Sequence, residues 1–454
     1  MTNRPHTSVD PSIFSAYDLR GIYGQTLTED TAYIIGRAAA QYLNVPEIVV
    51  GRDMRLSSPQ LAEAFIRGVT DQGVNAVDLG LITTDGLYFA VGKFDYPAGV
   101  MITASHNPGK YNGMKFCRAQ AYPISLDTGL ADIRDLAVKG VFAEPARKGK
   151  VTKRDVTDDF VKHALSFVDV SKIRPLKVVI DAGNGMAGMM MPRVFAHLPC
   201  ELVPMYFELD GNFPNHPASP IEPENTADLC KKVRETGADL GAAFDGDADR
   251  MFPVDEHGNV LDGSMVTEAV SNSLLHKYPG STILYNLIVS KSVPELITQL
   301  GGKAVRTRVG HSFIKAEMRK LNAIFGGEHS GHFYFRDNWF ADSGLIALLI
   351  MLELVSVEGK PLSAIIAPLD QGVRSGEINT RVSDVKAKLR ALEEHYGKGA
   401  KLVDHLDGLT VDYGDWWFNV RPSNTEPLLR LNIEANDRAL MEAKRDELTA
   451  FIRA

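Results

Sequence analysis

Apolar and polar positions alternate along this chain with a period that changes from segment to segment. Short apolar runs of strand length are separated by segments with helical spacing, and this rhythm appears in three blocks before residue 369. The expected strands are 48–50, 76–79 and 98–103 in the first block, 176–181 and 240–244 in the second, and 282–286, 303–307 and 323–325 in the third. Apolar strands alternating with helices are typical of parallel sheets covered on both faces. The pattern therefore predicts three successive α/β blocks.

Two of the expected helices are marked clearly in the sequence. In the helix that follows residues 48–50, Ser58 is expected to be the N-cap, Pro59 occupies the first helical position, and Gly73 lies just past the end. The last long helix of the third block, expected at about 342–357, is the most apolar.

The final block has a different pattern. A strand at 377–382 and a charged helix at 383–396 are followed by closely spaced strands at 409–413, 416–421 and 428–434, and then by a terminal helix. Because short links between consecutive strands imply antiparallel pairing, we expect a separate α+β unit.

Composition excludes several classes of function. A chain of 454 residues with 44% apolar content can form about three cores. Its net charge of −8, without a basic block carrying interleaved aromatic residues, argues against a nucleic-acid partner. The three cysteines (Cys117, Cys200 and Cys230) do not suit a disulfide framework or a four-cysteine zinc site. The most apolar run, 345–352, is too short to span a bilayer, so we expect a soluble, unprocessed cytoplasmic protein with no membrane partner.

The stretch Thr103-Ala104-Ser105-His106-Asn107-Pro108 places a hydroxyl nucleophile beside an imidazole directly after an expected strand. In α/β proteins the carboxyl ends of strands are where ligands bind. Ser and Asn also populate turns for purely local reasons. The stretch therefore predicts chemistry only in combination with other loops.

The stretch Asp245-Gly246-Asp247-Ala248-Asp249-Arg250 has a carboxylate at every second position, separated by the two smallest residues. Extended backbone would point all three carboxylates the same way, and they would repel one another without a cation between them. Oxygen ligands suit Mg²⁺ or Ca²⁺ better than zinc. A Ca²⁺ loop requires Gly where Arg250 stands, so Mg²⁺ is favoured, with Ca²⁺ or a solvated acidic loop as alternatives.

Two further loops carry polar groups suited to a phosphosugar. Residues 421–425 combine a guanidinium, two hydroxyls and an amide after a strand, which suits phosphate; a polar turn is the alternative. Residues 326–332 form a Gly-flanked loop in which Glu328 and Ser330 suit the neighbouring hydroxyls of a sugar; a polar β-turn is the alternative.

The stretch 183–188 matches the G-x-G-x-x-G pattern of dinucleotide-binding proteins. The acidic residue expected about 20 residues later at the end of a strand is missing, and the chain reaches an irregular loop at 210–214 instead. A tight strand-to-helix turn is therefore favoured. A dinucleotide-dependent oxidoreductase, or a non-catalytic Ca²⁺-binding module, is the alternative from another class.

Together these loops resemble the α-D-phosphohexomutase family, within it the bacterial phosphomannomutase/phosphoglucomutase branch. The phosphoserine, metal, sugar and phosphate loops correspond to 103–108, 245–250, 327–332 and 421–425. Residues 17–21, 111–115 and 310–311 match as well. The resemblance implies three α/β domains of similar topology and a C-terminal α+β domain with an antiparallel sheet, around a central cleft. We place them at 1–149, 150–252, 253–369 and 370–454, with a charged linker at 139–154.

The family's activity implies an isomerase that interconverts hexose 6-phosphate and hexose 1-phosphate through a phosphoserine enzyme and a hexose 1,6-bisphosphate. Ser105 would carry the phosphoryl group and would bind Mg²⁺ together with Asp245, Asp247 and Asp249. The other implied catalytic residues are His106, Lys115, Arg20 and Arg250, with His106 and Lys115 as candidates for moving the hydroxyl proton. The implied substrate contacts are Tyr17, His311, Glu328, Ser330, His332, Arg421, Ser423, Asn424 and Thr425.

The resemblance also implies cofactors and partners. Mg²⁺ would be the metal, glucose 1,6-bisphosphate or mannose 1,6-bisphosphate the activator, and a phosphosugar the substrate of a monomer or dimer. His329 stands where this branch often has Met, and residues 286–288 lack a lysine that some relatives place there. Whether Lys291 replaces it is left open, as is the choice among mannose, glucose and glucosamine phosphates; a phosphoglucosamine mutase is the nearest alternative.

Overall fold

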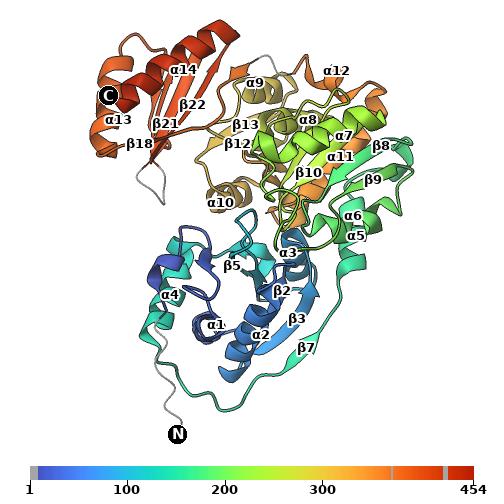
Figure 1. Cartoon of the computed structure of the whole chain (residues 1–454), viewed down its shortest axis with the longest axis vertical. Coiled ribbons are helices and arrows are strands. Elements are labelled where there is room, and N and C mark those ends of the chain that lie inside the picture. The colour runs from blue at the N-terminus through green and yellow to red at the C-terminus, as the bar shows by residue number, and fades with distance from the viewer. Residues whose placement is uncertain (1–8, 370–371, 423–427) are drawn as a thin grey trace.

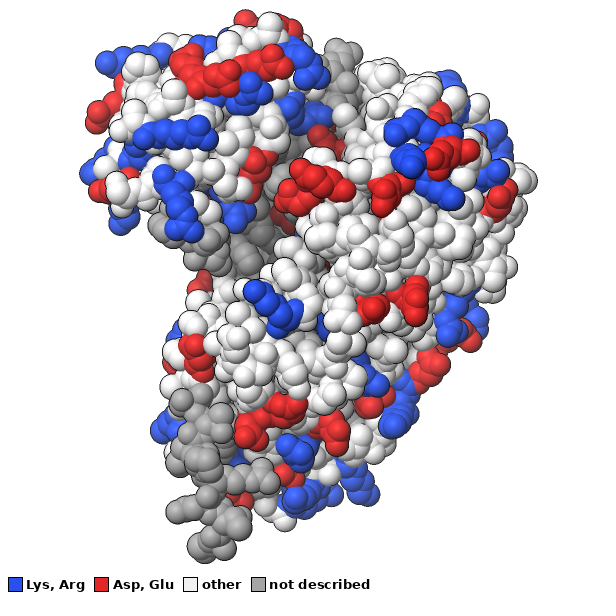
Figure 2. Space-filling view, in the orientation of Figure 1, with Lys and Arg blue, Asp and Glu red and all other residues white. Residues whose placement is uncertain are grey.

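The computed structural model describes residues 9–369, 372–422 and 428–454. These residues form four sheets, each with its own helices. Figure 1 shows the first unit at the bottom, the second and third together at the upper right, and the C-terminal unit at the upper left. In Figure 2 the surface is hollowed between the C-terminal unit and the first. The predicted fold class, three α/β units and an antiparallel C-terminal unit, is confirmed.

The first sheet is mixed. Its order is β1-β5-β4-β2-β3-β7, with β6 on β5; β4, β2, β3 and β7 are parallel and β5 is antiparallel to β4 and β1. The elements of this unit are η1 (Pro11–Ile13), β1 (Leu19–Ile22), α1 (Glu29–Leu43), β2 (Glu47–Arg52), α2 (Ser58–Asp71), β3 (Asn75–Leu81), α3 (Thr84–Lys93), β4 (Ala98–Ile102), β5 (Tyr111–Arg118), η2 (Ala119–Ala121), β6 (Tyr122–Pro123), η3 (Leu126–Thr128), α4 (Leu130–Lys139) and β7 (Val151–Lys153).

Two local predictions for this unit need correction. Ser58 is the first residue of α2 rather than its N-cap, and its hydroxyl donates to buried Asp53 Oδ1 at 2.5 Å. The predicted linker 139–154 contains β7, which pairs with β3 and covers the backbone groups of an otherwise open edge. The predicted boundary after residue 149 therefore falls before a strand of the first sheet.

The second sheet has the order β11-β10-β8-β9, with β11 antiparallel to β10. Because β11 belongs to this sheet, the predicted boundary between 252 and 253 falls inside a strand. The unit contains α5 (Thr157–Leu165), η4 (Val170–Lys172), β8 (Lys177–Asp181), α6 (Ala187–Phe195), β9 (Glu201–Met205), η5 (Pro223–Thr226), α7 (Ala227–Thr236), β10 (Leu240–Phe244) and β11 (Met251–Val254).

The third sheet has the order β13-β12-β14-β15-β16. The strands predicted at 282–286 and 303–307 are found, whereas the one predicted at 323–325 begins at Phe325. The unit contains α8 (Gly263–Lys277), β12 (Thr282–Asn286), α9 (Ser292–Gln299), β13 (Lys303–Thr307), α10 (His311–Leu321), β14 (Phe325–Gly327), β15 (Phe333–Phe335), η6 (Arg336–Asn338), β16 (Ala341–Asp342), α11 (Gly344–Glu358) and α12 (Leu362–Ile366).

The C-terminal sheet is antiparallel throughout its described pairings. Its order is β17-β22-β21-β20-β19, with β18 on β22. The short strands β17 and β19 are additions to the predicted set. The unit contains β17 (Val373–Arg374), β18 (Ile378–Arg381), α13 (Val385–Tyr396), β19 (Leu402–Asp404), β20 (Leu409–Asp412), β21 (Trp416–Pro422), β22 (Leu428–Ala435) and α14 (Arg438–Arg453).

The first three units share a hydrophobic core, whereas the C-terminal unit has a core of its own. One hydrophobic cluster runs from the first unit through the second into the third, and another lies within the C-terminal unit. At the junction of the first three units, Trp339 lies against Phe89 and His163, with ring centroids 6.0 and 5.2 Å away. Units one to three therefore share a packed interior, whereas the C-terminal unit is held largely by contacts at its surface.

Among the residues described, no helix has the length and apolar character needed to cross a membrane.

Candidate active site

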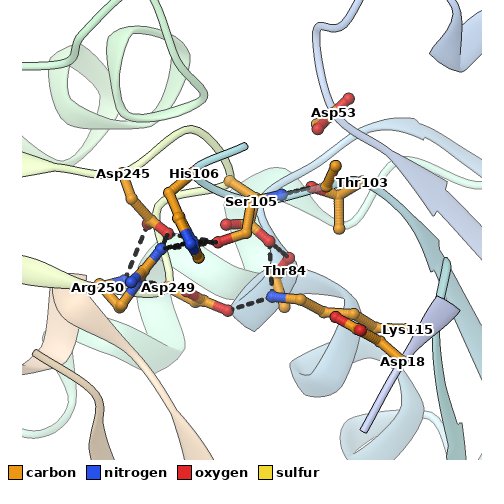
Figure 3. Close-up of polar contacts among 12 residues, drawn as sticks. Asp18, Asp53, Thr84, Thr103, Ser105, His106, Lys115, Asp245, Asp249 and Arg250 are labelled. Carbon is orange, nitrogen blue, oxygen red and sulfur yellow. Dashed lines mark hydrogen bonds and ion pairs between the residues drawn. The ribbon is translucent and has the colours of Figure 1, made fainter. Parts of the chain in front are cut away.

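Ser105 lies at the carboxyl end of β4 in a constrained backbone position. Its φ is 50°, in the left-handed region that non-glycine residues rarely adopt outside functional sites. Its amide donates to Thr103 Oγ1 at 2.9 Å, and its hydroxyl donates to Asp245 Oδ2 at 2.7 Å (Figure 3). Only 2% of Ser105 is exposed. The hydroxyl is thus buried at the junction of the first and second units and is already aimed at the acidic loop.

The three aspartates converge, but not for the reason predicted from sequence. Residues 246–249 form a turn and a bend rather than extended backbone, and Ala248 has a φ of 63°. Even so, one oxygen from each of Asp245, Asp247 and Asp249 lies within 4.8 Å of the others. Gly246 is required because a Cβ there would lie 2.5 Å from Ser105 O. Close contact with the serine loop therefore shapes the acidic loop.

Two cations neutralise the acidic loop. Lys115 on β5 contacts Asp247 Oδ2 at 2.8 Å and Asp249 Oδ2 at 2.6 Å. Burial disfavours its ammonium, but these two carboxylates outweigh burial and hold the pKa of Lys115 well above its usual value. Arg250 contacts Asp245 Oδ2 at 2.9 Å and donates to Ser105 Oγ at 3.0 Å. Burial raises the pKa of Asp245 to about 7 despite the charge of Arg250.

His106 and Arg20 complete this side of the site. Arg250 Nη2 donates to His106 Nδ1, which lies 3.3 Å from Ser105 Oγ. The charge of Arg250, together with burial, holds the pKa of His106 well below its usual value, so the imidazole is neutral. Arg20 on β1 donates to Asp18 Oδ2 at 2.9 Å and to the carbonyl of Ala104 at 3.3 Å, and it also contacts Asn107 Oδ1.

The acidic loop fits a divalent cation. Asp247 Oδ1 and Asp249 Oδ1 are buried, and neither has a hydrogen-bond partner among the residues described. Buried carboxylate oxygens are costly unless they are paired or bind metal, and an all-oxygen set suits Mg²⁺. The arrangement can therefore hold a cation beside Ser105 Oγ.

The predicted sugar loop presents its side chains from a turn after β14. Gly331 N donates to Glu328 O at 3.1 Å, so a β-turn, which was the alternative interpretation of this stretch, is present in the loop. Glu328 is buried and accepts from Tyr334 OH at 2.6 Å and from Gly310 N at 3.1 Å. Ser330 is half-buried. The Nδ1 atom of His332 lies 2.8 Å from Asp342 Oδ2 within the third unit and 3.9 Å from Asp249 Oδ1 of the acidic loop.

Tyr17 joins the first unit to the third, since its hydroxyl donates to Val309 O at 3.5 Å. His311 begins α10, but its side chain lies outside the described part of the structure. Ser423, Asn424 and Thr425 of the predicted phosphate loop are also outside the described residues.

The guanidinium of Arg421 is paired within the C-terminal unit. Its side chain is 8% exposed and contacts Glu377 Oε2 at 2.6 Å, while the other carboxylate oxygen contacts Arg430 at 3.1 Å. Sequence reasoning missed Glu377, which lies 44 residues from Arg421 along the chain.

The structure shows the contacts of Lys291 and His329, the two residues whose roles the sequence did not decide. Lys291 contacts Asp412 Oδ1 at 2.5 Å and donates to Gly414 O at 3.1 Å, so it joins the third unit to the C-terminal unit. Burial lowers the pKa of His329 to about 4, and its Nδ1 has no hydrogen-bond partner among the residues described. His329 lines a cavity of about 540 Å³ together with Ile288 and Glu377.

Other residues at the site escaped sequence reasoning. Thr84, at the start of α3, donates to Asp247 Oδ2 at 2.5 Å, and the fully buried Arg55 donates to the carbonyls of the serine loop. The position of Arg55 in the sequence could have indicated a role at the site. Residues 52–55 include three charged residues at the end of a buried strand, and ligand sites are common at such ends in α/β proteins.

The glycine-rich stretch 183–188 is a strand-to-helix turn between β8 and α6. A Cβ at Gly188 would lie 2.3 Å from Phe207 O, and one at Gly185 would lie 2.8 Å from Gly246 O. The chain's own backbone thus fills the space that a pyrophosphate would need. These glycines allow neighbouring backbone to pack closely against this turn, and the backbone near Gly185 belongs to the acidic loop.

Comparisons with known proteins place the chain in a family. It matches all four phosphoglucomutase/phosphomannomutase domain models: alpha/beta/alpha domain I over residues 11–142, domain II over 158–258, domain III over 262–371, and the C-terminal domain over 377–450. These matches cover most of the chain.

Full-length relatives agree with the domain matches. The chain is 43% identical over 446 residues to a protein of Xanthomonas campestris pv. campestris named "Phosphohexose mutases", covering 97% of this chain and 99% of the relative. It is 40% identical over 450 residues to a phosphomannomutase of Escherichia coli, covering 97% and 99%. The crystal structure of a phosphoglucomutase/phosphomannomutase family protein from Burkholderia thailandensis matches with a TM-score of 0.89 and 34% identity over 98% of each chain.

Proposed function

Because the chain belongs to the phosphoglucomutase/phosphomannomutase family, we propose that this mutase interconverts the 6-phosphate and 1-phosphate of a hexose through a phosphoserine at Ser105 and a hexose 1,6-bisphosphate. The observation that carries the proposal is the 2.7 Å contact between Ser105 Oγ and Asp245 Oδ2, within a buried cluster of three carboxylates and two cations. Phosphoryl transfer needs charge neutralisation around a positioned nucleophile, and this cluster supplies both.

The residues around Ser105 would have two roles: the aspartates would bind a metal ion, and the cations would stabilise negative charge on the transferring phosphoryl group. Asp245, Asp247 and Asp249 would hold Mg²⁺ with a phosphoserine oxygen, and the ion would neutralise charge on the transferring group. Lys115 stays protonated between two carboxylates, so it acts as a cation rather than a base in this state. Arg250 holds Ser105 Oγ from the other side.

The proton of the attacking hydroxyl has two candidate carriers. His106 is neutral, but its Nδ1 already accepts from Arg250. His332 belongs to the third unit, and its Nδ1 lies 2.8 Å from Asp342 Oδ2, so Nε2 is the nitrogen that would exchange a proton with substrate. We therefore propose His332 as a further proton-handling group, whereas the sequence resemblance implied that it contacts the substrate.

Substrate would be held across the hollow between the first and C-terminal units. Glu328 accepts from Tyr334, Gly310 and Asn286, which would leave about one of the roughly four acceptor sites of its carboxylate for a sugar hydroxyl. Arg421 would bind the phosphate that is not reacting. We infer that mannose and glucose phosphates are used within about a hundredfold of each other, because they differ only at C2 and the Glu328 contacts lie elsewhere.

The test is a coupled assay offering mannose, glucose and glucosamine 1-phosphates side by side, with intact-mass spectrometry of the enzyme. Ser105→Ala is expected to lower turnover by several orders of magnitude and to lose the phosphate mass. Ser171→Ala, at an exposed position, is the matched control. Full activity of Ser105→Ala without an added phosphate donor would exclude the covalent route, and preference for the glucosamine phosphate would favour the phosphoglucosamine mutase alternative.

A further inference from the structure

A buried guanidinium lies behind the serine loop and takes no part in the proposed chemistry. Arg55 precedes α2 and is 0% exposed. Its Nη2 donates to the carbonyls of Ser105 and Asn107, both at 2.7 Å. Its Nη1 donates to the carbonyls of Pro108 and Tyr111, both at 3.0 Å. Four donors of one side chain therefore hold four carbonyls of the segment that carries the nucleophile.

The remaining contacts of Arg55 fix its orientation. Its fifth donor, Nε, contacts Asp53 Oδ2 at 3.2 Å, and Asp53 Oδ1 accepts from the Arg55 amide at 3.0 Å. The ring of Phe213, from the second unit, lies 5.1 Å from the guanidinium carbon. A Cβ at Gly211 would lie 2.7 Å from Arg55 Cα, so the irregular loop at 210–214 packs directly on this residue.

We propose that Arg55 is a positioning residue for Ser105, an inference that rests on the proposed function. Ser105 has a left-handed φ, which costs on the order of 1–3 kcal/mol unless the surroundings enforce it. Arg55 bonds the carbonyl of Ser105 itself and the carbonyls that follow it, so it holds the turn that aims Ser105 Oγ at Asp245 Oδ2.

The contacts of Arg55 require the planar guanidinium group of arginine. Arginine offers five N–H donors in a fixed arrangement, and here all five have acceptors. Lysine keeps the charge but offers three donors from a single atom. Arg55→Lys therefore changes the positioning of the loop while retaining the local charge.

The experiment compares Arg55→Lys with wild type and with Arg52→Lys. Arg52, on β2, pairs with Asp78 at 3.2 Å and does not bond the serine loop, so it is the matched control. For Arg55→Lys we expect kcat to fall about 100-fold, because a displacement of about 1 Å at a reacting group has that effect. KM for the sugar phosphate should stay within about threefold of wild type, since the proposed phosphate contact of Arg421 and sugar contact of Glu328 do not depend on the serine loop.

Two further readouts, with Arg52→Lys as the control in each, separate positioning from general stability. Transfer of phosphate from glucose 1,6-bisphosphate to Ser105, followed by intact mass, should slow by the same factor as kcat. Hydrogen exchange should rise in the 103–111 segment and not in the C-terminal sheet. Arg52→Lys should match wild type in every readout. A folded Arg55→Lys variant with wild-type kcat, or with its loss confined to KM, overturns the inference.

If Arg55→Lys does not fold, Phe213→Leu decides the question, because it removes the aromatic ring that lies 5.1 Å from the guanidinium carbon and keeps an apolar side chain in its place. We then expect kcat to fall about tenfold at unchanged KM, and an unchanged kcat overturns the inference. A wild-type enzyme without phosphoserine refutes the proposed function and this inference with it. A phosphorylated wild type beside an unaffected variant refutes the inference alone.

Discussion

Glu377 forms an ion pair with Arg421, the residue whose guanidinium is expected to bind the substrate phosphate. Its carboxylate contacts Arg421 at 2.6 Å through one oxygen and Arg430 at 3.1 Å through the other. The side chain of Arg421 is 8% exposed, so solvent screens this pair only weakly. A phosphate arriving at Arg421 must either displace the carboxylate or bind beside a like charge. Glu377→Gln should therefore strengthen phosphate binding.

The size of the effect follows from the contact that is lost. A hydrogen bond to a charged group contributes about 1.5–3 kcal/mol, and every 1.4 kcal/mol corresponds to about tenfold in Kd. Glu377→Gln should thus lower the Kd for glucose 6-phosphate by roughly 10- to 100-fold. The free energy of unfolding should fall by about 1–3 kcal/mol, because two guanidiniums lose their counter-ion, and added phosphate should restore it.

Isothermal titration with inorganic phosphate and with glucose 6-phosphate measures the first effect, and urea unfolding with and without phosphate measures the second. Glu442→Gln is the matched control, since Glu442 lies in α14 and pairs with Arg438 at 3.8 Å at an exposed position. An unchanged or weaker affinity in a folded Glu377→Gln variant would show that the carboxylate positions Arg421 for phosphate instead of competing with it.

Three further predictions come from other parts of the molecule. Asp247→Asn should be nearly inactive and should bind Mg²⁺ more weakly than wild type in a titration, because one ligand charge is removed; turnover unaffected by a chelator would contradict this. Burial disfavours the charged form of His216, but the hydrogen bond to Asp181 at 3.0 Å, the charge of that carboxylate and the carbonyl of Pro217 together outweigh burial and raise the pKa of His216. Its contribution to stability should therefore be complete below about pH 6.5 and disappear as pH rises through the folded-state pKa, so that His216→Gln destabilises more at pH 6 than at pH 9 in thermal unfolding. Gly92→Ala should cost about 1–3 kcal/mol in urea unfolding, because the added Cβ would lie 2.1 Å from the Trp339 ring; wild-type stability would mean that the ring moves freely.

The sequence by itself determined the elements and the chemistry of each loop. Apolar periodicity is local, so the strands at 282–286 and 303–307 and the antiparallel C-terminal unit could be predicted, as could a loop after each strand carrying Ser105, the aspartates or Glu328. The errors are equally local. β7 was missed because a three-residue strand among charged residues has no periodicity of its own, and it exists only because β3 offers an edge.

The tertiary structure decided how these loops act on one another. Ser105 and Asp245 lie 140 residues apart, and their contact depends on the packing of two sheets. The aspartates converge through a turn with a left-handed Ala248, shaped by contact with the serine loop, and not through an extended strand. Arg55 and Glu377 escaped prediction because the partners that define each role arrive from other elements only when the chain has folded. The charged residues after β2 marked the place of Arg55 but not its contacts.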